Sequence, residues 1–322
     1  MGSRKGINQA NYFRILERQA KPRWGSAYVA SILATPQEAP SKSHAVILTS
    51  GKLGREVHCL SLGEAAAAIL ALYHSNLVEL HEQKMLSPWP TPHPLSGFPE
   101  NRQVGLPSHR GLIDVAEQLG HLKVLPRVTV TQSDPTNPLV QIFPYVGDFL
   151  LFMSKQDGTR YCVNWSVKDT CSSFKRPFGT LKRQGEEPAT ILARHQIEEA
   201  YYQDAHIRTV RIASDTINKD VAANLTQLFL NHRTRISLSE SQRGDILDKF
   251  RIAMDVGIPP HEVILGVCAR GTVTPHECRT VLYQAIWNRE LRVDLFRPVL
   301  PNLPLRTEKR DVLEVYEDWF RE

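Results

Sequence analysis

The alternation of apolar and polar residues is clearest between Asp148 and Lys168, where it predicts a β-hairpin. Phe149 to Met153 is an apolar run, and Tyr161 to Val167 is rich in residues that favour strands. The dipeptide Asp157-Gly158 lies between the two runs and suits the positive φ values of a tight turn. In the closed hairpin, a carboxylate near the start of one strand and a lysine at the end of the next become neighbours.

The second predicted strand has two different faces, because side chains alternate along a strand. One face is apolar and contains Trp165, which we interpret as a core residue, like Trp287 further along the chain, rather than as a base-stacking platform. The other face is polar and resembles part of a site. Its residues are Asn164, Ser166 and Lys168.

Similar patterns predict further elements before residue 235. Ser61 followed three residues later by Glu64 has the spacing of a capping box and predicts a helix start. Six prolines within residues 86–110 indicate a surface loop or an extended insertion. The expected strands are 45–48, 57–60, 78–83 and 208–213, residues 126–147 are β-prone, and the expected helices are 65–73, 111–120, 188–203 and 216–232. This order predicts an α/β core with a mixed sheet.

The pattern changes from Ser237 onward to short helices at 245–256, 259–269 and 274–290. The last begins with Thr274 as N-cap and a proline at the first helical position. A strand is expected at 291–298. Three small helices followed by a strand predict a winged-helix domain.

Length and composition agree with a globular chain of about two domains. The 322 residues are 42% hydrophobic and 23% charged, with a net charge of +5 and a pI near 8.9. This charge is compatible with a nucleic-acid partner but is weak evidence for one. We expect a basic N-terminal arm over 1–25, the α/β domain over 26–235 and the winged-helix domain over 236–322.

Cysteine usage and hydropathy favour a cytoplasmic protein without a membrane partner. The five cysteines are scattered, and no Cys-x-x-Cys pair exists, so neither a zinc site nor a disulfide framework is indicated. His276 and Cys278 with Cys268 are better interpreted as ordinary side chains in a reducing compartment. No apolar run approaches the ~18 residues of a membrane span, and the N-terminus has no signal-peptide pattern.

The N-terminal 25 residues carry several cations and a single acidic residue, Glu17. Tyr12 and Phe13 are interleaved with them. Two interpretations stay open, a solvated helix start and an arm that lies along a phosphate backbone. The candidate DNA-binding residues are Arg4, Lys5, Arg14, Arg18, Lys21 and Arg23.

Glu64, Asp148 and Lys168 occur in the order and context expected of a phosphodiester hydrolase. Mg²⁺ is typically held by one or two carboxylates, with water and substrate phosphate completing its octahedron. A lysine adds a fixed positive charge near the transition state. Taken singly, these residues are better explained as a capping glutamate, a strand-start aspartate and a solvated strand end. Together, in this order, they indicate a catalytic site.

The same residues lie in a longer series of motifs that resembles the TnsA-type endonuclease subunit of heteromeric transposases. The resemblance covers most of the chain, with the proline-rich loop as an insertion. The motifs are Ser61-Leu-Gly-Glu64, Leu80-His-Glu-Gln83, Gly147-Asp148-Phe-Leu, Val167-Lys168, Glu198-Glu-Ala-Tyr201-Tyr202, Asp215-Thr-Ile-Asn218, Ala223-Asn224-Leu225, Leu282-Tyr-Gln-Ala-Ile-Trp-Asn and Val293-Asp-Leu-Phe-Arg-Pro298.

The resemblance implies a restriction-endonuclease-like core with a C-terminal winged helix. It also implies Mg²⁺-dependent cleavage at the 5′ ends of a transposon, with Mn²⁺ able to substitute. The implied partners are transposon-end DNA, a DDE-type transposase that cuts the 3′ ends, and an AAA+ ATPase regulator contacted through the C-terminal region. By position, Glu64, Asp148 and Lys168 match the family's active-site residues, and Glu198 matches an additional acidic position.

One departure concerns the metal ligands. The family motif commonly places glutamine or glutamate two residues before the lysine, and Ser166 stands there in this chain. A serine hydroxyl is a weaker ligand than a carboxylate or an amide. The candidate metal ligands are therefore Glu64, Asp148, Ser166 and the Val167 carbonyl, with the Asn164 amide oxygen as a potential addition.

Ser166 keeps a second function class open, namely a non-catalytic DNA-binding or scaffold protein that recruits transposition partners. A third alternative is a stand-alone restriction-type or repair nuclease that cuts without a partner. Three arginines flank the third C-terminal helix and suit phosphate contacts, although we favour protein contacts for this domain. They are Arg279, Arg289 and Arg292.

Overall fold

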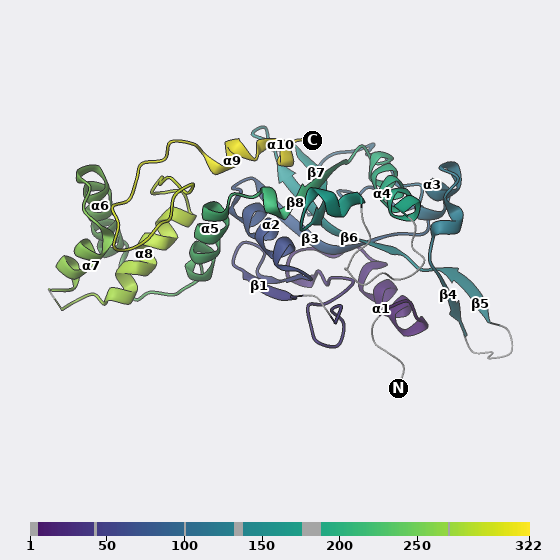
Figure 1. Ribbon diagram of the computed structural model, residues 1–322, viewed down its shortest axis with the longest axis horizontal. Helices are drawn as coiled ribbons and strands as arrows, with labels where there is room; N and C mark the ends of the chain where they lie inside the picture. The colour runs from purple at the N-terminus through teal and green to yellow at the C-terminus, as the bar shows by residue number, and fades with distance from the viewer. Residues whose placement is uncertain (1–5, 42–43, 100, 132–137, 176–187, 270) are drawn as a thin grey trace. The chain divides into compact units, whose positions relative to one another are not determined.

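The computed structural model describes residues 6–41, 44–99, 101–131, 138–175, 188–269 and 271–322 (Figure 1). The chain divides into two compact units. The first comprises Met1–Ala68, Asn76–Thr216 and Trp319–Glu322, and the second comprises Ile69–Ser75 and Ile217–Asp318. The expected boundary at 235/236 thus differs from the observed division, which assigns the preceding helix to the second unit.

A four-stranded mixed sheet forms the centre of the first unit (Figure 1). Its strands, in spatial order, are β3 (Leu77–Leu86), β6 (Tyr145–Ser154), β7 (Arg160–Lys168) and β8 (Arg208–Ala213). The pairs β3–β6 and β6–β7 are antiparallel, and β7–β8 is parallel. Helix α4 (Pro188–Gln203) supplies the crossover that a parallel pair requires. The prediction of an α/β chain with a mixed sheet is therefore confirmed.

Strands β6 and β7 form the predicted hairpin, with Phe149 opposite Trp165 in the antiparallel register. Gly158 has φ 82°, and Asp157 Oδ1 accepts a hydrogen bond from the Thr159 amide at 2.8 Å, which stabilises the turn. Most of the polar face of β7 is shielded from solvent, because Asn164 is fully buried and Ser166 is 2% exposed, whereas Lys168 at its end is 20% exposed. Trp165 is a core residue, and its indole N–H donates to the Trp319 carbonyl at 2.7 Å.

Helices and two small hairpins surround the sheet within the first unit. The helices are α1 (Gln9–Gln19), α2 (Leu62–Tyr73), whose C-terminal turns belong to the second unit, and α3 (Leu112–Gln118). The hairpins are β1 (Val46–Ser50) with β2 (Arg55–Cys59), and β4 (Arg127–Val130) with β5 (Leu139–Ile142). An apolar cluster joins Leu150 and Phe152 of the sheet to Ile197 of α4 and Val115 of α3.

A buried ion cluster connects β2 to β3. Both Glu82 carboxylate oxygens lie 2.9 Å from an Arg55 guanidinium nitrogen, and Glu79 Oε1 lies 3.4 Å from the other. The same guanidinium stacks over the Tyr28 ring at 4.7 Å. Because buried charges are costly unless paired, this arrangement ties the β1–β2 hairpin firmly to the sheet.

The second unit is helical. Its elements are α5 (Lys219–Asn231), α6 (Glu240–Val256), α7 (Pro260–Cys268), α8 (Pro275–Trp287) and α9 (Val312–Val315), and a last turn, α10 (Glu317–Phe320), closes the chain. The N-cap predicted at Thr274 is present, and the structure adds a capping box with Glu277. Trp287, which is half-buried, contacts Tyr73 and Phe229 within this unit.

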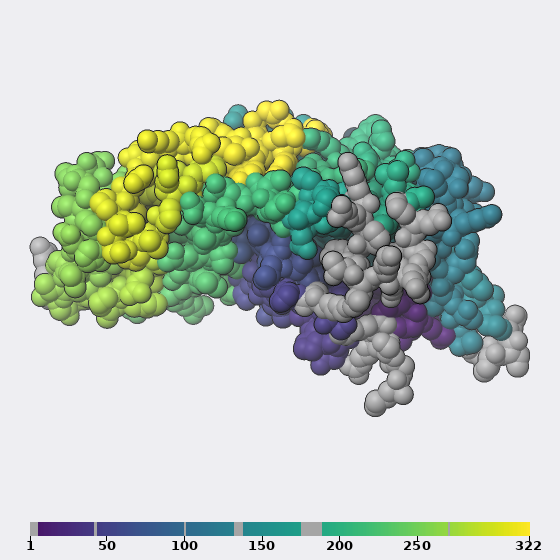
Figure 2. All heavy atoms as spheres, in the orientation of Figure 1, coloured from purple at the N-terminus to yellow at the C-terminus, as the bar shows by residue number. Residues whose placement is uncertain are grey.

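The strand expected at 291–298 does not form. Val293 makes one isolated bridge with Thr307, and the rest of the stretch is held by side-chain contacts. Asn224 of α5 donates to the Leu295 and Arg297 carbonyls at 2.9 and 2.8 Å and accepts from the Val299 amide at 3.0 Å. One buried amide thus satisfies three backbone groups in and just after this stretch, while the Asp294 amide and the Arg292 carbonyl bond to the backbone of Arg306 and Glu308. Figure 2 shows the last residues of the chain, in yellow, at the surface in this view.

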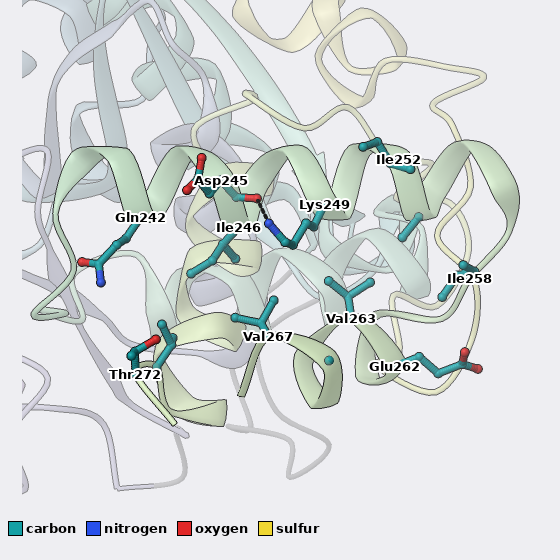
Figure 3. A pocket seen from close by; sticks show the side chains of 13 residues that line it. Gln242, Asp245, Ile246, Lys249, Ile252, Ile258, Glu262, Val263, Val267 and Thr272 are labelled. Atoms are coloured by element: carbon teal, nitrogen blue, oxygen red, sulfur yellow. Dashed lines mark hydrogen bonds between the residues drawn. The ribbon is translucent and has the colours of Figure 1, made fainter. Parts of the chain in front are cut away.

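An apolar groove of about 480 Å³ lies between α6 and α7 of the second unit. Figure 3 shows Ile246 of α6 directed toward Val263 and Val267 of α7. The groove has charged residues at its rim, including Lys249, whose ammonium donates to the Asp245 carbonyl at 3.3 Å.

Candidate functional site

Glu64 lies in the first turn of α2, where its carboxylate accepts several protein hydrogen bonds. Ser61 Oγ accepts from the Glu64 amide at 3.0 Å and donates to Glu64 Oε1 at 3.3 Å. Glu64 Oε2 accepts from the Leu60 amide at 2.7 Å. The predicted serine–glutamate pair therefore caps the helix, although the glutamate reaches Leu60 rather than the N-cap amide. Capping fixes the direction of this carboxylate.

Asp148 and Lys168 lie close together at one end of the β6–β7 hairpin. Lys168 Nζ is 3.5 Å from Asp148 Oδ2 and 3.0 Å from the Val167 carbonyl oxygen. Asp148 Oδ2 also accepts a hydrogen bond from the Val167 amide at 2.7 Å. Their side chains are 19% and 20% exposed, so both groups remain accessible to a ligand. The hairpin thus places the carboxylate and the lysine side by side.

The electrostatics of the site indicate excess negative charge around Glu64. Burial, and next the negative charge of Asp148, raise the pKa of Glu64 to about 8. The pKa of Glu198 on α4 is also raised, mainly by burial and then by Asp148. These two shifts show that Glu64 and Glu198 lie within electrostatic reach of Asp148. A cation bound among them would relieve this repulsion.

His195 of α4 is a titratable neighbour of the site that the sequence did not single out as functional. Burial lowers the pKa of His195 to about 4, and the positive charge of Lys168 is the next cause. The imidazole is therefore neutral at physiological pH. Its spacing on the helix was visible in the sequence, but its proximity to Lys168 arises from the crossover of α4 over the sheet.

Gln83 also belongs to the site, and sequence analysis missed its role. Its Nε2 donates to Glu64 Oε2 at 3.0 Å, and its backbone has φ 48°, which is unusual for a residue other than glycine. The register of β3 against β6 pairs Glu82 with Phe149 and Lys84 with Gly147 but omits Gln83 and Asp148. The ladder is therefore broken opposite Asp148. Such local strain is often found at functional sites.

The buried polar residues of β7 extend from this site toward α4. Asn164 Nδ2 donates to Glu198 Oε1 and to Thr209 Oγ1, both at 3.2 Å. Among the described residues, Asn164 Oδ1 has no hydrogen-bond donor. Ser166 lies in register with Arg211 of β8. Glu198 and Asn164 are thus in direct contact, and Ser166 follows them along the buried side of the strand.

Gly63 permits the close approach that brings α2 to the end of β7. A Cβ atom at this position would lie 2.6 Å from Ser214 Oγ and 3.2 Å from Asp169 Oδ1. Because the shortest distance is below 3.0 Å, a side chain here would displace Ser214, which follows β8, or the start of α2. The glycine therefore allows α2 to lie close to the ends of β7 and β8.

The donor set suits Mg²⁺, although it is small. Glu64 and Asp148 supply carboxylate oxygens and Val167 a carbonyl oxygen, which fits a metal that binds proteins through one or two carboxylates and water. Asn164 Oδ1 is a further oxygen without a donor among the described residues. In the described part of the chain, no group of three or more His, Cys, Asp or Glu residues is placed to hold a metal. Cys268 and Cys278 are free cysteines.

The N-terminal cations do not form a free arm. Tyr12 and Ile15 of α1 are buried, and the helix begins at an N-cap, Asn8. The Arg18 guanidinium contacts both oxygens of Glu38 at 2.7 and 2.9 Å, and Arg14 lies 3.5 Å from the same carboxylate. The expectation of an extended basic arm therefore does not hold for α1, because its apolar face packs on the first unit. Lys21 is exposed and Arg23 half-buried, while Arg4 and Lys5 lie outside the described residues.

Comparison of the chain with protein-family models and with curated proteins gave no match. Over the described residues, every helix is too short or too polar to span a bilayer. The fold and the geometry of the site therefore carry the functional argument.

Proposed function

We propose that this protein is a Mg²⁺-dependent DNA endonuclease subunit of a heteromeric transposase, which hydrolyses phosphodiester bonds at the 5′ ends of a transposon. The proposal combines the motif resemblance with the grouping of Glu64, Asp148 and Lys168 around one end of the sheet. The observation that carries most weight is the 3.5 Å separation of Asp148 Oδ2 and Lys168 Nζ, close to the Glu64 carboxyl, whose pKa is raised by burial and by Asp148. A carboxylate pair with an adjacent lysine suits phosphodiester hydrolysis.

Each residue has a role in this proposal. Glu64, Asp148 and the Val167 carbonyl would hold Mg²⁺. The bound metal would activate a water molecule and screen the charge on the scissile phosphate. Lys168 places a positive charge beside the phosphate. Gln83 and the Leu60 amide orient the Glu64 carboxylate. The first unit would represent a restriction-endonuclease-like core.

The partners belong to the same proposal. Helices α6 to α8 with the Val293–Thr307 bridge resemble a winged helix in their order, and this unit would contact the transposase subunit and the AAA+ regulator. DNA would be bound by the first unit. Lys21, which is exposed, is better placed for phosphate contact than Arg14 and Arg18, whose charges are paired with Glu38.

Cleavage of a supercoiled plasmid that carries the element end tests the proposal. With the partner transposase and Mg²⁺, the wild-type protein should cut the 5′ strand, and Asp148→Asn and Lys168→Met should reduce cutting by roughly 100-fold or more. Asp114→Asn, in an exposed position on α3, is the matched control and should cut normally. Unchanged cleavage by Asp148→Asn would refute the site. Cleavage without the transposase would favour a stand-alone nuclease.

The alternative of a non-catalytic DNA-binding scaffold is favoured by two observations. Ser166 stands where a stronger ligand is expected, and the Glu64 carboxylate already accepts bonds from Leu60, Ser61 and Gln83. Titration with Mn²⁺, followed by the decrease of its free electron paramagnetic resonance signal, distinguishes the two functions. A catalytic site binds Mn²⁺ in the wild type and loses it in Glu64→Gln and Asp148→Asn, whereas a scaffold shows no such difference.

A further inference from the structure

The first unit contains a cavity of about 190 Å³ whose walls are largely apolar but carry several polar side chains, and whose lining excludes Glu64, Asp148 and Lys168. Its walls come from the end of α1 and the following loop, from β3, from the proline-rich loop and from the C-terminal turn of α4. The proline-rich loop, which contributes no residue to the candidate active site, lies opposite β3 across this cavity.

The proline-rich loop is fixed where it covers the cavity. Thr91 and His109 form an antiparallel bridge with N–O distances of 3.0 and 2.9 Å. Gly111 adopts φ 102°, and a Cβ atom there would lie 2.6 Å from the Trp89 carbonyl carbon, so the chain is closely packed at the end of the loop. The cavity is therefore largely preformed, as small-ligand sites usually are.

Several polar atoms of the lining residues lack partners. Among the described residues, ten buried side-chain nitrogen or oxygen atoms have no hydrogen-bond partner, and four of them belong to lining residues of this one cavity. These four atoms are Gln19 Oε1, His81 Nδ1, His81 Nε2 and Tyr202 Oη. Buried polar groups are normally paired, so this concentration indicates that a polar ligand or water occupies the space.

The charge of the lining is positive. It includes Lys84 and no aspartate or glutamate. Lys84 Nζ lies 5.9 Å from the Tyr28 ring centroid, and no carboxylate among the described residues pairs with it. Burial lowers the pKa of Lys84 to about 8, and the Lys84 charge contributes to the lowered pKa of His81. A bound anion would stabilise the ammonium.

We propose that this cavity binds a compact oxyanion together with a hydroxyl donor on the same molecule, namely hydrogen phosphate or a small phosphate monoester that has a free hydroxyl group. Lys84, Tyr202 and one His81 nitrogen would donate hydrogen bonds to the phosphate oxygens. Gln19 Oε1 and the other His81 nitrogen are acceptors, and the P–O–H proton of hydrogen phosphate, or a free hydroxyl group of the monoester, would donate to one of them. Sulfate has the same size and charge but no proton at neutral pH.

Titration calorimetry on the full chain, in a metal-free and phosphate-free buffer, tests this site. Inorganic phosphate should bind at one site per chain, and sulfate should bind at least about tenfold more weakly, because it leaves the acceptors unpaired. Ribose 5-phosphate distinguishes the source of the ligand, since tighter binding than inorganic phosphate identifies a monoester and weaker binding identifies the free anion.

Variants assign the binding to the cavity. Lys84→Met should lower phosphate affinity roughly tenfold or more, whereas Lys123→Met on the exposed surface and Lys168→Met at the candidate active site should leave it unchanged. Tyr202→Phe removes one unpaired hydroxyl and should weaken phosphate binding without lowering the melting temperature of the ligand-free protein. If Lys84→Met does not fold, phosphate binding by Tyr202→Phe is the test of the cavity. Equal binding of sulfate and phosphate, equal losses in Lys84→Met and Lys123→Met, or no binding at millimolar phosphate would overturn the proposal.

Discussion

The raised pKa of Glu64 predicts that ionisation of this one carboxyl destabilises the metal-free protein as the pH rises. Its pKa is about 8 in the folded chain, against an ordinary value of 4.5. Between these values the folded chain keeps a proton that the unfolded chain has lost. The free energy of unfolding therefore decreases with pH over this range, by about 1.4 kcal/mol per pH unit for one proton.

Substitution of Glu64 by glutamine should remove this dependence. Glutamine is isosteric and stays neutral, and one oxygen remains to accept from the Leu60 amide and from Gln83 Nε2. From pH 6 to pH 8, the wild type should lose about 2 to 3 kcal/mol of stability relative to Glu64→Gln. Burial is the first cause of the shift and the charge of Asp148 the second, so Asp148→Asn should recover part of the difference.

Urea denaturation in the presence of a chelator, at half-unit steps from pH 5 to pH 9, measures the effect. Other groups titrate in this range, so the informative quantity is the difference between the wild type and the variant at each pH. Glu117→Gln on the exposed side of α3 serves as the matched control and should run parallel to the wild type. If the curves of the wild type and Glu64→Gln also run parallel, the carboxyl is not buried beside Asp148 and the electrostatic reasoning fails.

Three further predictions concern the metal, Gly63 and Asn224. Mg²⁺ should raise the melting temperature of the wild type more at pH 8 than at pH 6, because it competes with the Glu64 proton, and Glu64→Gln should lose this gain. Gly63→Ala should lower the free energy of unfolding in urea by about 1 to 3 kcal/mol and reduce cleavage. Adding Ser214→Ala should restore part of the stability and of the cleavage, since the clash is with the Ser214 hydroxyl. Equal effects of Gly63→Ala with Ser214 and with Ala at position 214 would contradict this explanation. Asn224→Leu should cost about 3 kcal/mol or more by leaving three backbone groups unpaired, whereas exposed Asn288→Leu should cost little.

Much of the local structure followed from the sequence because it depends on short-range interactions. The Asp157-Gly158 turn and the flanking β-formers specify the hairpin, and the turn also sets its register. Thr274 with Glu277 specifies the start of α8 through hydrogen bonds within one turn. The strand expected at 291–298 was wrong, because its apolar side chains are buried by packing and Asn224 takes the Leu295 and Arg297 carbonyls.

Some contacts of the candidate site were predictable from the sequence, and others were not. The proximity of Asp148 and Lys168 was predictable, since they are joined by a hairpin of known register. The contribution of Gln83 was not, because a left-handed residue in a strand depends on how β3 meets β6 and α2. The pairing of Arg14 and Arg18 with Glu38 was also not predictable from the sequence. It neutralises two of the cations that the sequence alone suggested as DNA-binding residues.

By itself, the sequence determined the α/β class, most element positions and the order of the three chemical groups, all of which depend on periodicity and neighbouring residues. Only the tertiary structure decided which polar groups are buried together. Burial and the approach of Asp148 raise the pKa of Glu64, and the packing of the proline-rich loop against β3 and α4 encloses Lys84. These effects depend on distances between segments far apart in the chain, and no local pattern encodes such distances.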